Sequence, residues 1–277
     1  KAHMPDGPFT PGLHLEGPYL AMAQRGAQDP RYIKTPDPSE YVPLLDYAAG
    51  DIARWTAAPE LPGALELGDE LKRRGILASI GHSDAEYTDV LAAVRHGFTH
   101  VTHLYSCTST IVRRGGFRFP GVLESAFMLD ELSVEVIADG CHLPPELLRL
   151  VWRSKSPERV ALISDALRCA GQDVTESVTG SRGDGQRIII EDGVAKLPDR
   201  SAFAGSVAMA DRLLRVMHLR ADVPLGDCVR MMSETPARIL GLSDRKGRLA
   251  PGLDADVALL RDDLSIRQVY CAGKPAV

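Results

Sequence analysis

The chain has 277 residues, of which 44% are hydrophobic and 25% are charged, as expected for a globular protein with a sizeable core. Its formal net charge of -5 provides no basic field for a nucleic-acid partner. No apolar run reaches the roughly 18 residues of a membrane span. The five dispersed cysteines favour reduced thiols over a disulfide framework. We therefore expect a cytoplasmic protein with no membrane and no nucleic-acid partner.

Six polar patches, each placed after an apolar run, follow one another along the first 170 residues. They are 14–18 (HLEGP), 58–60 (APE), 81–83 (GHS), 102–104 (THL), 139–142 (DGCH) and 164–166 (SDA). The short apolar runs at 77–80, 98–102, 132–138 and 160–163 are typical of strands buried on both faces of a parallel sheet. Polar residues at successive strand ends indicate the active face of a (β/α) barrel.

Helical segments alternate with these strands. Leucines predict a first helix over 62–74, which ends before Gly75. Residues 83–86 have the pattern of a capping box and predict a second helix that ends at 96–97. Residues 144–146 predict the start of a third helix. We count six βα units, whereas a closed barrel has eight. We therefore expect an α/β fold of the (β/α)8 TIM-like class whose first two units are absent from this sequence.

The pattern changes after residue 180. Asp192-Gly193 predicts a β-hairpin near 183–198, an apolar stripe predicts a helix over 205–220, and Thr235-Pro236 predicts the N-cap and first residue of a short helix. The tail is strand-like at 252–260 and 268–272. We assign 1–244 to the third to eighth strands of the barrel, and 245–277 to the C-terminal part of a small β-sandwich domain.

Glu16, His82 and His103 each follow a different predicted strand. Taken singly, Glu16 could be a surface turn residue, and each histidine could be a hydrogen-bonded structural residue. Together, one carboxylate and two imidazoles are good ligands for zinc or iron, and three protein ligands leave a position for water. The combination predicts a catalytic divalent metal.

Three further groups are candidates for chemistry. Asp165 could be the general base that takes a proton from metal-activated water and later protonates a leaving amine, or a structural residue that caps the next helix. His142 could bind substrate or stabilise an oxyanion, and Asp139 could be a loop anchor or a functional group. Arg113 and Arg114 are expected to lie in a flexible cationic loop. These side chains are either solvated or bind a phosphate or carboxylate of the substrate.

These motifs resemble those of the N-acetylglucosamine-6-phosphate deacetylases, within the amidohydrolase superfamily. The resemblance covers nearly the whole chain and includes 81–85 (GHSDA), 102–105 (THLY), 204–206 (AGS), 235–238 (TPAR) and 252–256 (GLDAD) as well as the patches above. It implies that Glu16, His82 and His103 bind one or two divalent ions. It also implies that Asp165 is the catalytic acid/base and that His142 contacts the sugar and the amide carbonyl.

The resemblance also implies a substrate site and a homodimer. Ser106 and Cys107 stand where the family commonly has Asn-Ala, whose backbone amides hold the 6-phosphate, and Gln28 stands where some members have a histidine that contacts substrate. Arg114 matches an arginine that reaches the phosphate in the neighbouring subunit. Ala204 and Gly205 belong to the matched AGS motif and are expected to line the substrate site.

The expected activity is metal-dependent hydrolysis of the acetamido group of N-acetyl-D-glucosamine 6-phosphate to glucosamine 6-phosphate and acetate. One alternative is another amidohydrolase, acting on N-acyl amino acids or on other N-acyl amino sugars, with the same metal ligands and a different handle for substrate. A second alternative is a non-catalytic truncated homologue. Activity on phosphorylated and unphosphorylated N-acetylglucosamine distinguishes the first alternative, and metal analysis tests the second.

Overall fold

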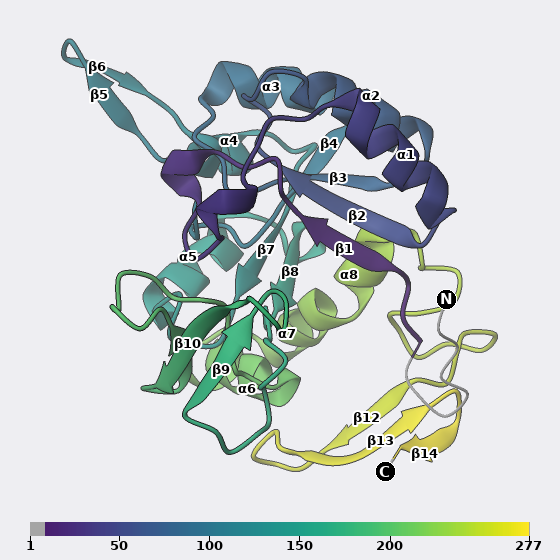
Figure 1. Cartoon of the computed structure of the whole chain (residues 1–277). Coiled ribbons are helices and arrows are strands. Elements are labelled where there is room, and N and C mark those ends of the chain that lie inside the picture. The colour runs from purple at the N-terminus through teal and green to yellow at the C-terminus, as the bar shows by residue number, and fades with distance from the viewer. Residues whose placement is uncertain (1–8, 277) are drawn as a thin grey trace. The chain divides into compact units, whose positions relative to one another are not determined.

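A computed structural model describes residues 9–276 (Figure 1). These residues form two compact units, one of 11–135 and one of 136–276 together with 9–10. The 11–135 unit contains β1 (Leu13–Glu16), β2 (Ile52–Ala57), β3 (Leu77–Ile80), β4 (Phe98–Val101), β5 (Val112–Arg114), β6 (Phe117–Phe119), α1 (Pro38–Ala48), α2 (Ala64–Arg73), α3 (Tyr87–Arg95), α4 (Val122–Met128), and the 3-10 turns η1 (Met22–Gln24) and η2 (Pro30–Tyr32).

The main sheet has the strand order β1-β2-β3-β4-β7-β8, in which β7 (Ser133–Ile137) passes from the first unit into the second. The pairs from β1 to β4, and β4 with β7, are parallel. Helices α2 and α3 pack against β3 and β4 (Figure 1). The predicted α/β fold with parallel strands is confirmed. The strands expected at 77–80, 98–102, 132–138 and 160–163 are β3, β4, β7 and β8 (Val160–Ile163).

The helix after β3 begins later than predicted. Residues 83–86 do not form its capping box. Instead, Glu86 is the N-cap of α3, and the Asp89 side chain accepts a hydrogen bond from the Glu86 backbone N–H. The Ser83 hydroxyl is used elsewhere, because it donates to the carboxylate of Glu60. The predicted end of the helix at His96 is confirmed.

The segment after β4 is a β-hairpin rather than the predicted flexible loop. Strands β5 and β6 pair antiparallel across Gly115 and Gly116, both of which have positive φ. The hairpin projects from its unit (Figure 1). Two glycines favour such a turn because its left-handed φ values cost little without a side chain.

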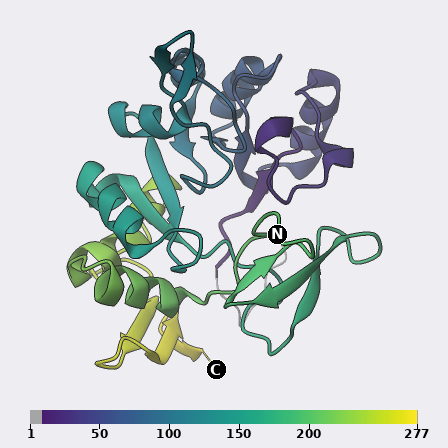
Figure 2. The same cartoon turned by 90° about the vertical axis from the view of Figure 1, so that its left-hand side faces the viewer.

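The second unit is built from shorter elements. It contains β8, β9 (Glu176–Thr179), β10 (Gln186–Glu191), β11 (Val194–Lys196), β12 (Val257–Leu260), β13 (Ile266–Cys271), β14 (Lys274–Ala276), α5 (Pro145–Ser154), α6 (Ala210–Arg215), α7 (Leu225–Met232), α8 (Glu234–Ile239), the 3-10 turn η3 (Pro157–Arg159) and the π-helical turn η4 (Val216–Arg220). The predicted hairpin near 183–198 is confirmed as β10 and β11, joined at Asp192-Gly193 with φ values of 54 and 75°. A third strand, β9, pairs with β10 and was not predicted from the sequence. Figure 2 shows this three-stranded sheet in green.

The predicted first residues of two helices in this unit were wrong. The helix expected over 205–220 begins at Ala210, because Ser206 forms a bridge with Ala166 and donates its backbone N–H to the Asp165 carbonyl. Helix α8 begins at Glu234 with Ser233 as N-cap, so Thr235 and Pro236 lie inside the first turn. The strand-like tail is confirmed as the antiparallel sheet β12-β13-β14. No helix within residues 9–276 is long and apolar enough to span a bilayer.

Candidate metal centre

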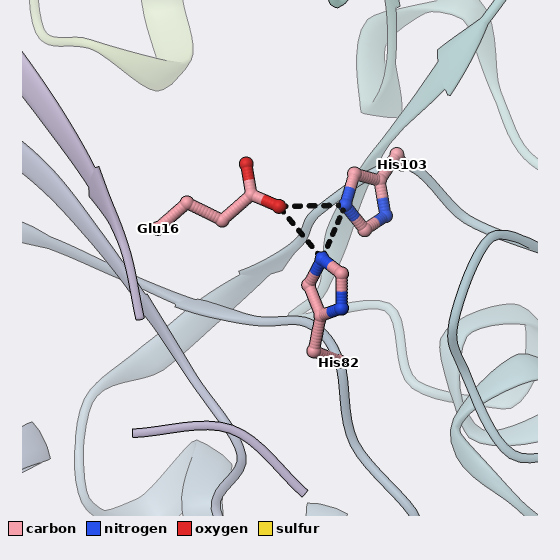
Figure 3. Close-up of side chains that lie close together, drawn as sticks. All are labelled: Glu16, His82 and His103. Carbon is pink, nitrogen blue, oxygen red and sulfur yellow. Dashed lines mark hydrogen bonds and ion pairs between the residues drawn. The ribbon is translucent and has the colours of Figure 1, made fainter. Parts of the chain in front are cut away.

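Glu16, His82 and His103 lie together at the ends of β1, β3 and β4 (Figure 3). The Oε1 atom of Glu16 lies 2.7 Å from Nε2 of His82 and 3.1 Å from Nε2 of His103. The two Nε2 atoms are 3.2 Å apart. Both imidazoles are buried, and each residue offers one ligand atom within 4.8 Å of the others. The three predicted ligands therefore converge from three strands.

The opposite nitrogen of each imidazole is held by the backbone. Nδ1–H of His82 donates to the Gln24 carbonyl at 2.9 Å, and Nδ1–H of His103 donates to the Ser106 carbonyl at 3.1 Å. Such contacts fix the ring orientation and leave Nε2 as the ligand atom of the neutral imidazole. Two imidazole nitrogens and one carboxylate oxygen form a donor set that fits a divalent ion such as zinc or iron.

Hydrogen bonds link the three side chains to one another and shift the pKa values of Glu16 and His82. Burial would raise the pKa of Glu16, but hydrogen bonds from His103 and His82 outweigh it, so the pKa lies well below its ordinary value. Burial would lower the pKa of His82, but contacts with Cys107 and Glu16 outweigh it and raise the pKa to about 10. A cation and a proton would compete for the same place, so metal binding is expected to release a proton.

Several predicted substrate residues lie around this group. The side-chain amide of Gln28 donates to Oε1 of Glu16 at 3.4 Å. Ser106 contacts His103 through its backbone, and Cys107 contacts His82 through its side chain. Arg114 lies on the β5-β6 hairpin, where it pairs with Glu86 and its guanidinium lies 4.2 Å from the ring centre of Phe119.

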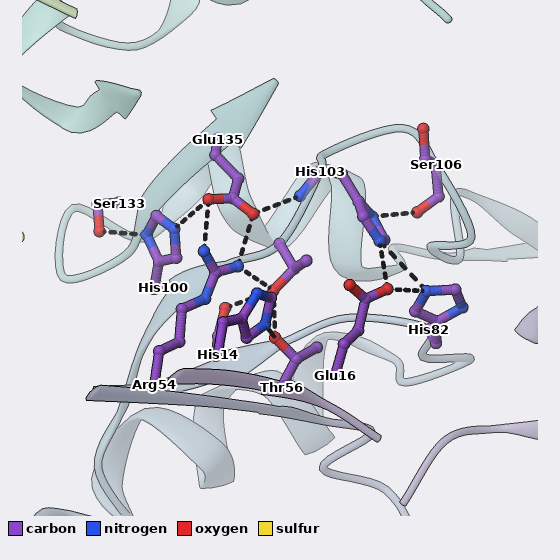
Figure 4. Close-up of polar contacts among 12 residues, drawn as sticks. His14, Glu16, Arg54, Thr56, His82, His100, His103, Ser106, Ser133 and Glu135 are labelled. Atoms are coloured by element: carbon purple, nitrogen blue, oxygen red, sulfur yellow. Dashed lines mark hydrogen bonds and ion pairs between the residues drawn. The ribbon is translucent and has the colours of Figure 1, made fainter. Parts of the chain in front are cut away.

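A buried polar network lies behind the metal centre, and the sequence analysis missed it (Figure 4). Arg54 on β2 donates to both carboxylate oxygens of Glu135 on β7, at 2.6 and 2.5 Å, and to Thr102 at 2.6 Å. His100 lies 3.3 Å from the same carboxylate and bonds Ser133 at 2.8 Å. The signal for this network was a charged residue in the middle of each of two apolar strands.

The network also contacts one of the predicted metal ligands. The backbone N–H of His103 donates to Oε1 of Glu135 at 3.3 Å. Burial would raise the pKa of Glu135, but Arg54 and His100 hold it well below its ordinary value, and burial lowers the pKa of His100. Glu135 is therefore an anion that is matched by the Arg54 cation in a nearly dry environment.

A second polar cluster lies in the 136–276 unit. Nδ1–H of His142 donates to the Asp139 carboxylate at 2.8 Å, and the hydroxyl of Ser206 donates to the same oxygen at 2.9 Å. Burial would raise the pKa of Asp139, but its contacts with His142 outweigh it and lower the pKa to about 2. Asp139 thus anchors its loop by accepting the backbone N–H groups of Cys141 and His142, and it also orients the His142 ring.

Asp165 belongs to the same neighbourhood. Its backbone has a φ of 49°, and its carbonyl accepts the Ser206 N–H at 2.9 Å. Gly205, with a φ of 78°, packs closely enough that a Cβ atom would lie 3.2 Å from the Asp165 carbonyl oxygen. The structure thus brings Asp165 together with Gly205 and Ser206, next to Ala204. These residues and the metal centre belong to different compact units, so their convergence stays a prediction.

Comparison with known proteins identifies the family. Residues 5–276 match the amidohydrolase family. The chain belongs to that family. This amidohydrolase is 32% identical over 265 residues to an N-acetylglucosamine-6-phosphate deacetylase of Bacillus subtilis (strain 168), covering 96% of this chain and 65% of that protein. It is also 32% identical over 274 residues to the enzyme of that name from Danio rerio, covering 98% of this chain and 66% of that protein.

A solved structure agrees with these relatives. The crystal structure of N-acetyl-D-glucosamine-6-phosphate deacetylase from Mycobacterium smegmatis matches with a TM-score of 0.87 and 34% identity, covering 96% of this chain and 69% of that one. The predicted resemblance of this amidohydrolase to these deacetylases is therefore confirmed. The chain spans 65% and 66% of the length of the two curated relatives above.

Proposed function

We propose that this amidohydrolase hydrolyses the acetamido group of N-acetyl-D-glucosamine 6-phosphate to glucosamine 6-phosphate and acetate. The observation that carries the proposal is the convergence of Glu16, His82 and His103 on one point, with both imidazoles oriented by backbone carbonyls. Deacetylases acting on this substrate are among the relatives above. An N-acetylgalactosamine-6-phosphate deacetylase of Shewanella is 30% identical, so the 4-epimer is the second candidate substrate.

Glu16, His82 and His103 would hold a zinc or iron ion. When bound, such an ion acts as a Lewis acid on a carbonyl and lowers the pKa of water. Asp165 would take a proton from the attacking water and return it to the amine as the C–N bond breaks, which balances the products acetate and amine. His142, held in place by Asp139, would lie against the carbonyl oxygen and stabilise the negative charge that develops there.

The sugar phosphate would lie among the remaining predicted residues. Ser106 and Cys107 would contact the 6-phosphate, with the Cys107 backbone N–H as a donor, since the Ser106 N–H donates to the His103 carbonyl at 2.9 Å. Gln28, Ala204 and Gly205 would contact the substrate. Arg114 would come from a second copy of the chain, so we propose a homodimer. Support comes from its position on a projecting hairpin and from the strength of guanidinium–phosphate hydrogen bonds.

Removing the metal is expected to abolish acetate release from N-acetylglucosamine 6-phosphate. Dialysis against a chelator should lower turnover by at least about two orders of magnitude, and adding zinc or iron should restore it, because loss of Lewis-acid catalysis costs several kcal/mol. His103→Ala should lower both the metal content and the turnover, as measured by elemental analysis and an acetate assay. His96→Ala is the matched control, because His96 pairs with Asp69 at the surface. Full activity in the metal-free protein would contradict the proposal.

Arg114→Ala is expected to raise KM for the phosphorylated substrate roughly 10-fold to 100-fold, since a charged hydrogen bond contributes about 1.5–3 kcal/mol. Turnover of unphosphorylated N-acetylglucosamine should be unchanged. Arg118→Ala is the control, because Arg118 lies on the same hairpin and donates to the Gly116 carbonyl.

Mixing variants tests whether Arg114 acts on a neighbouring site. A mixture of the Arg114→Ala and Asp165→Asn proteins should regain activity through mixed dimers, in which one site combines Asp165 of one copy with Arg114 of the other. Absence of any regain, with dimers present by light scattering, would assign Arg114 to its own site.

A further inference from the structure

Both histidines of the metal centre have an unusual backbone conformation. The φ values are 49° for His82 and 29° for His103, in the left-handed region that side chains other than glycine rarely adopt. Such strain costs on the order of 1–3 kcal/mol per residue and persists only where surrounding contacts hold it. The contacts that hold these two residues therefore decide where the imidazoles point.

At His82 backbone hydrogen bonds join its carbonyl to the Ala21 N–H and the Ser83 N–H to the Cys107 carbonyl, and the side-chain contacts to the following turn come from Glu60, which lies just beyond β2. One carboxylate oxygen accepts the Ser83 hydroxyl at 2.8 Å, and the other accepts the backbone N–H of Asp84 at 2.6 Å. Ser83 is fully buried, and its hydroxyl oxygen in turn accepts the N–H of Ala85 at 3.1 Å. Glu60 thereby fixes the chain directly after the imidazole ligand.

At His103 the corresponding contacts come from Glu135. Its carboxylate accepts the His103 N–H (Figure 4). Its backbone carbonyl accepts the N–H of Leu104 at 2.8 Å. Glu135 lies on β7, which pairs with the ligand strand β4, and Glu60 lies in the segment just after β2, which pairs with the ligand strand β3. Each imidazole thus has one glutamate, on or just after the neighbouring strand, that contacts its local backbone.

We propose that Glu60 is a positioning residue for the metal centre, which fixes the strained turn after His82 so that its imidazole meets Glu16 and His103. This role rests on the proposed function of that centre. Glu135 does the same for His103, but its ion pair with Arg54 makes any substitution there ambiguous. Glu60 gives the cleaner test, since its side chain bonds a hydroxyl and a backbone N–H and, within residues 9–276, forms no ion pair with a cation.

The test compares Glu60→Ala with Glu60→Gln. A glutamine can still accept the Asp84 N–H through its oxygen and donate its amide N–H to the Ser83 oxygen, whereas alanine removes both contacts. The measurements are the Kd for Co²⁺ by chelator competition and the visible spectrum of the Co²⁺-loaded protein. Glu124→Ala is the matched control, because Glu124 also accepts one hydroxyl and one backbone N–H, from Thr110 and Gly121, away from the ligands.

Glu60→Ala should weaken Co²⁺ binding roughly 10-fold to 100-fold and alter the spectrum, as is typical for loss of an outer partner of a metal ligand. Glu60→Gln and Glu124→Ala should bind close to the native value. Native-like binding by Glu60→Ala would overturn the positioning role. Equal weakening by Gln and Ala would overturn it too, because charge rather than positioning would then be responsible.

Co²⁺ binding by His103→Ala tests the metal ligands independently of Glu60. If His103→Ala binds Co²⁺ as tightly as the native protein, the ligand set is wrong, and both the proposed function and the role of Glu60 fail. If His103→Ala loses the ion while Glu60→Ala keeps it, only the role of Glu60 fails. Thermal unfolding of Glu60→Ala and Glu124→Ala, run side by side, separates a general loss of stability from a specific loss of metal affinity.

Discussion

Replacing Asp165 by asparagine is expected to reduce turnover of N-acetylglucosamine 6-phosphate by about 10²-fold to 10⁴-fold, the usual contribution of a positioned general acid/base. The amide of asparagine has the same shape as the carboxylate, but it can neither take a proton from water nor give one to the departing amine. The measurement is kcat by acetate release, with metal content determined on the same samples.

The substitution is informative because the fold should survive it. Asp165 has a left-handed backbone with a φ of 49°, a conformation that asparagine adopts more readily than most residues. Asp173→Asn is a suitable control, since Asp173 is an exposed aspartate in the same unit. Unchanged turnover in Asp165→Asn, with native metal content, would remove Asp165 from the mechanism.

Replacing Arg54 by methionine is expected to lower the free energy of unfolding by about 3–5 kcal/mol, because it leaves the buried Glu135 carboxylate without its cation. The side chains of Arg54 and Glu135 are 12% and 4% exposed, so solvent cannot replace the lost partner. Urea unfolding measures the effect. Adding Glu135→Gln to Arg54→Met should recover part of the loss, since no buried charge then remains unmatched. A double variant no more stable than the single one would contradict this account.

The loss of stability in Arg54→Met should also depend on pH. In the native protein the pKa of Glu135 is depressed, so its contribution is present above the ordinary carboxyl range and is lost as the pH falls below it. Without Arg54, burial dominates and the pKa of Glu135 rises, so stability is lost as the pH rises. His100, a titratable group 3.3 Å from this carboxylate, can supply a compensating proton at low pH. The variant should therefore be less impaired at pH 5 than at pH 8.

A surface ion pair provides the comparison for this prediction. Arg74 bonds Glu70 and Asp46 at the edge of α2, where water can replace the lost contacts. Arg74→Met should lower the free energy of unfolding much less than Arg54→Met, because Asp46 is 63% exposed and water can reach the pair. A similar loss of stability in Arg54→Met and Arg74→Met would mean that burial of Glu135 is not the cause.

Much of the sheet and the metal centre could be predicted because strong local patterns encode them. The apolar runs before His82, His103 and Asp165 are long enough to fix β3, β4 and β8, and carboxyl ends of parallel strands place their following residues at one edge. Helix starts were less predictable, since they depend on distant partners. Ser83 reads as an N-cap from sequence, but the carboxylate of Glu60 takes its hydroxyl.

The buried network could not be predicted for a different reason. Arg54 and Glu135 are separated by 81 residues, and neither shows from its own surroundings which opposite charge will face it. A charged residue inside an apolar strand indicates only that some partner exists. The same holds for Glu60. Its motif at 58–60 is visible in the sequence, but its contacts with Ser83 and Asp84 could be found only in the structure.

The polar side chains on one face of the sheet also constrain how the strands align. His100 on β4 pairs with Ser133 on β7, which sets Glu135 on the same face as Arg54 and leaves Val134 on the other. A slip of one residue would turn Glu135 away from its cation and bring an aliphatic side chain in its place. We therefore expect the buried ion pair to disfavour strand alignments other than the native one, a discrimination that a uniformly aliphatic sheet would provide less strongly.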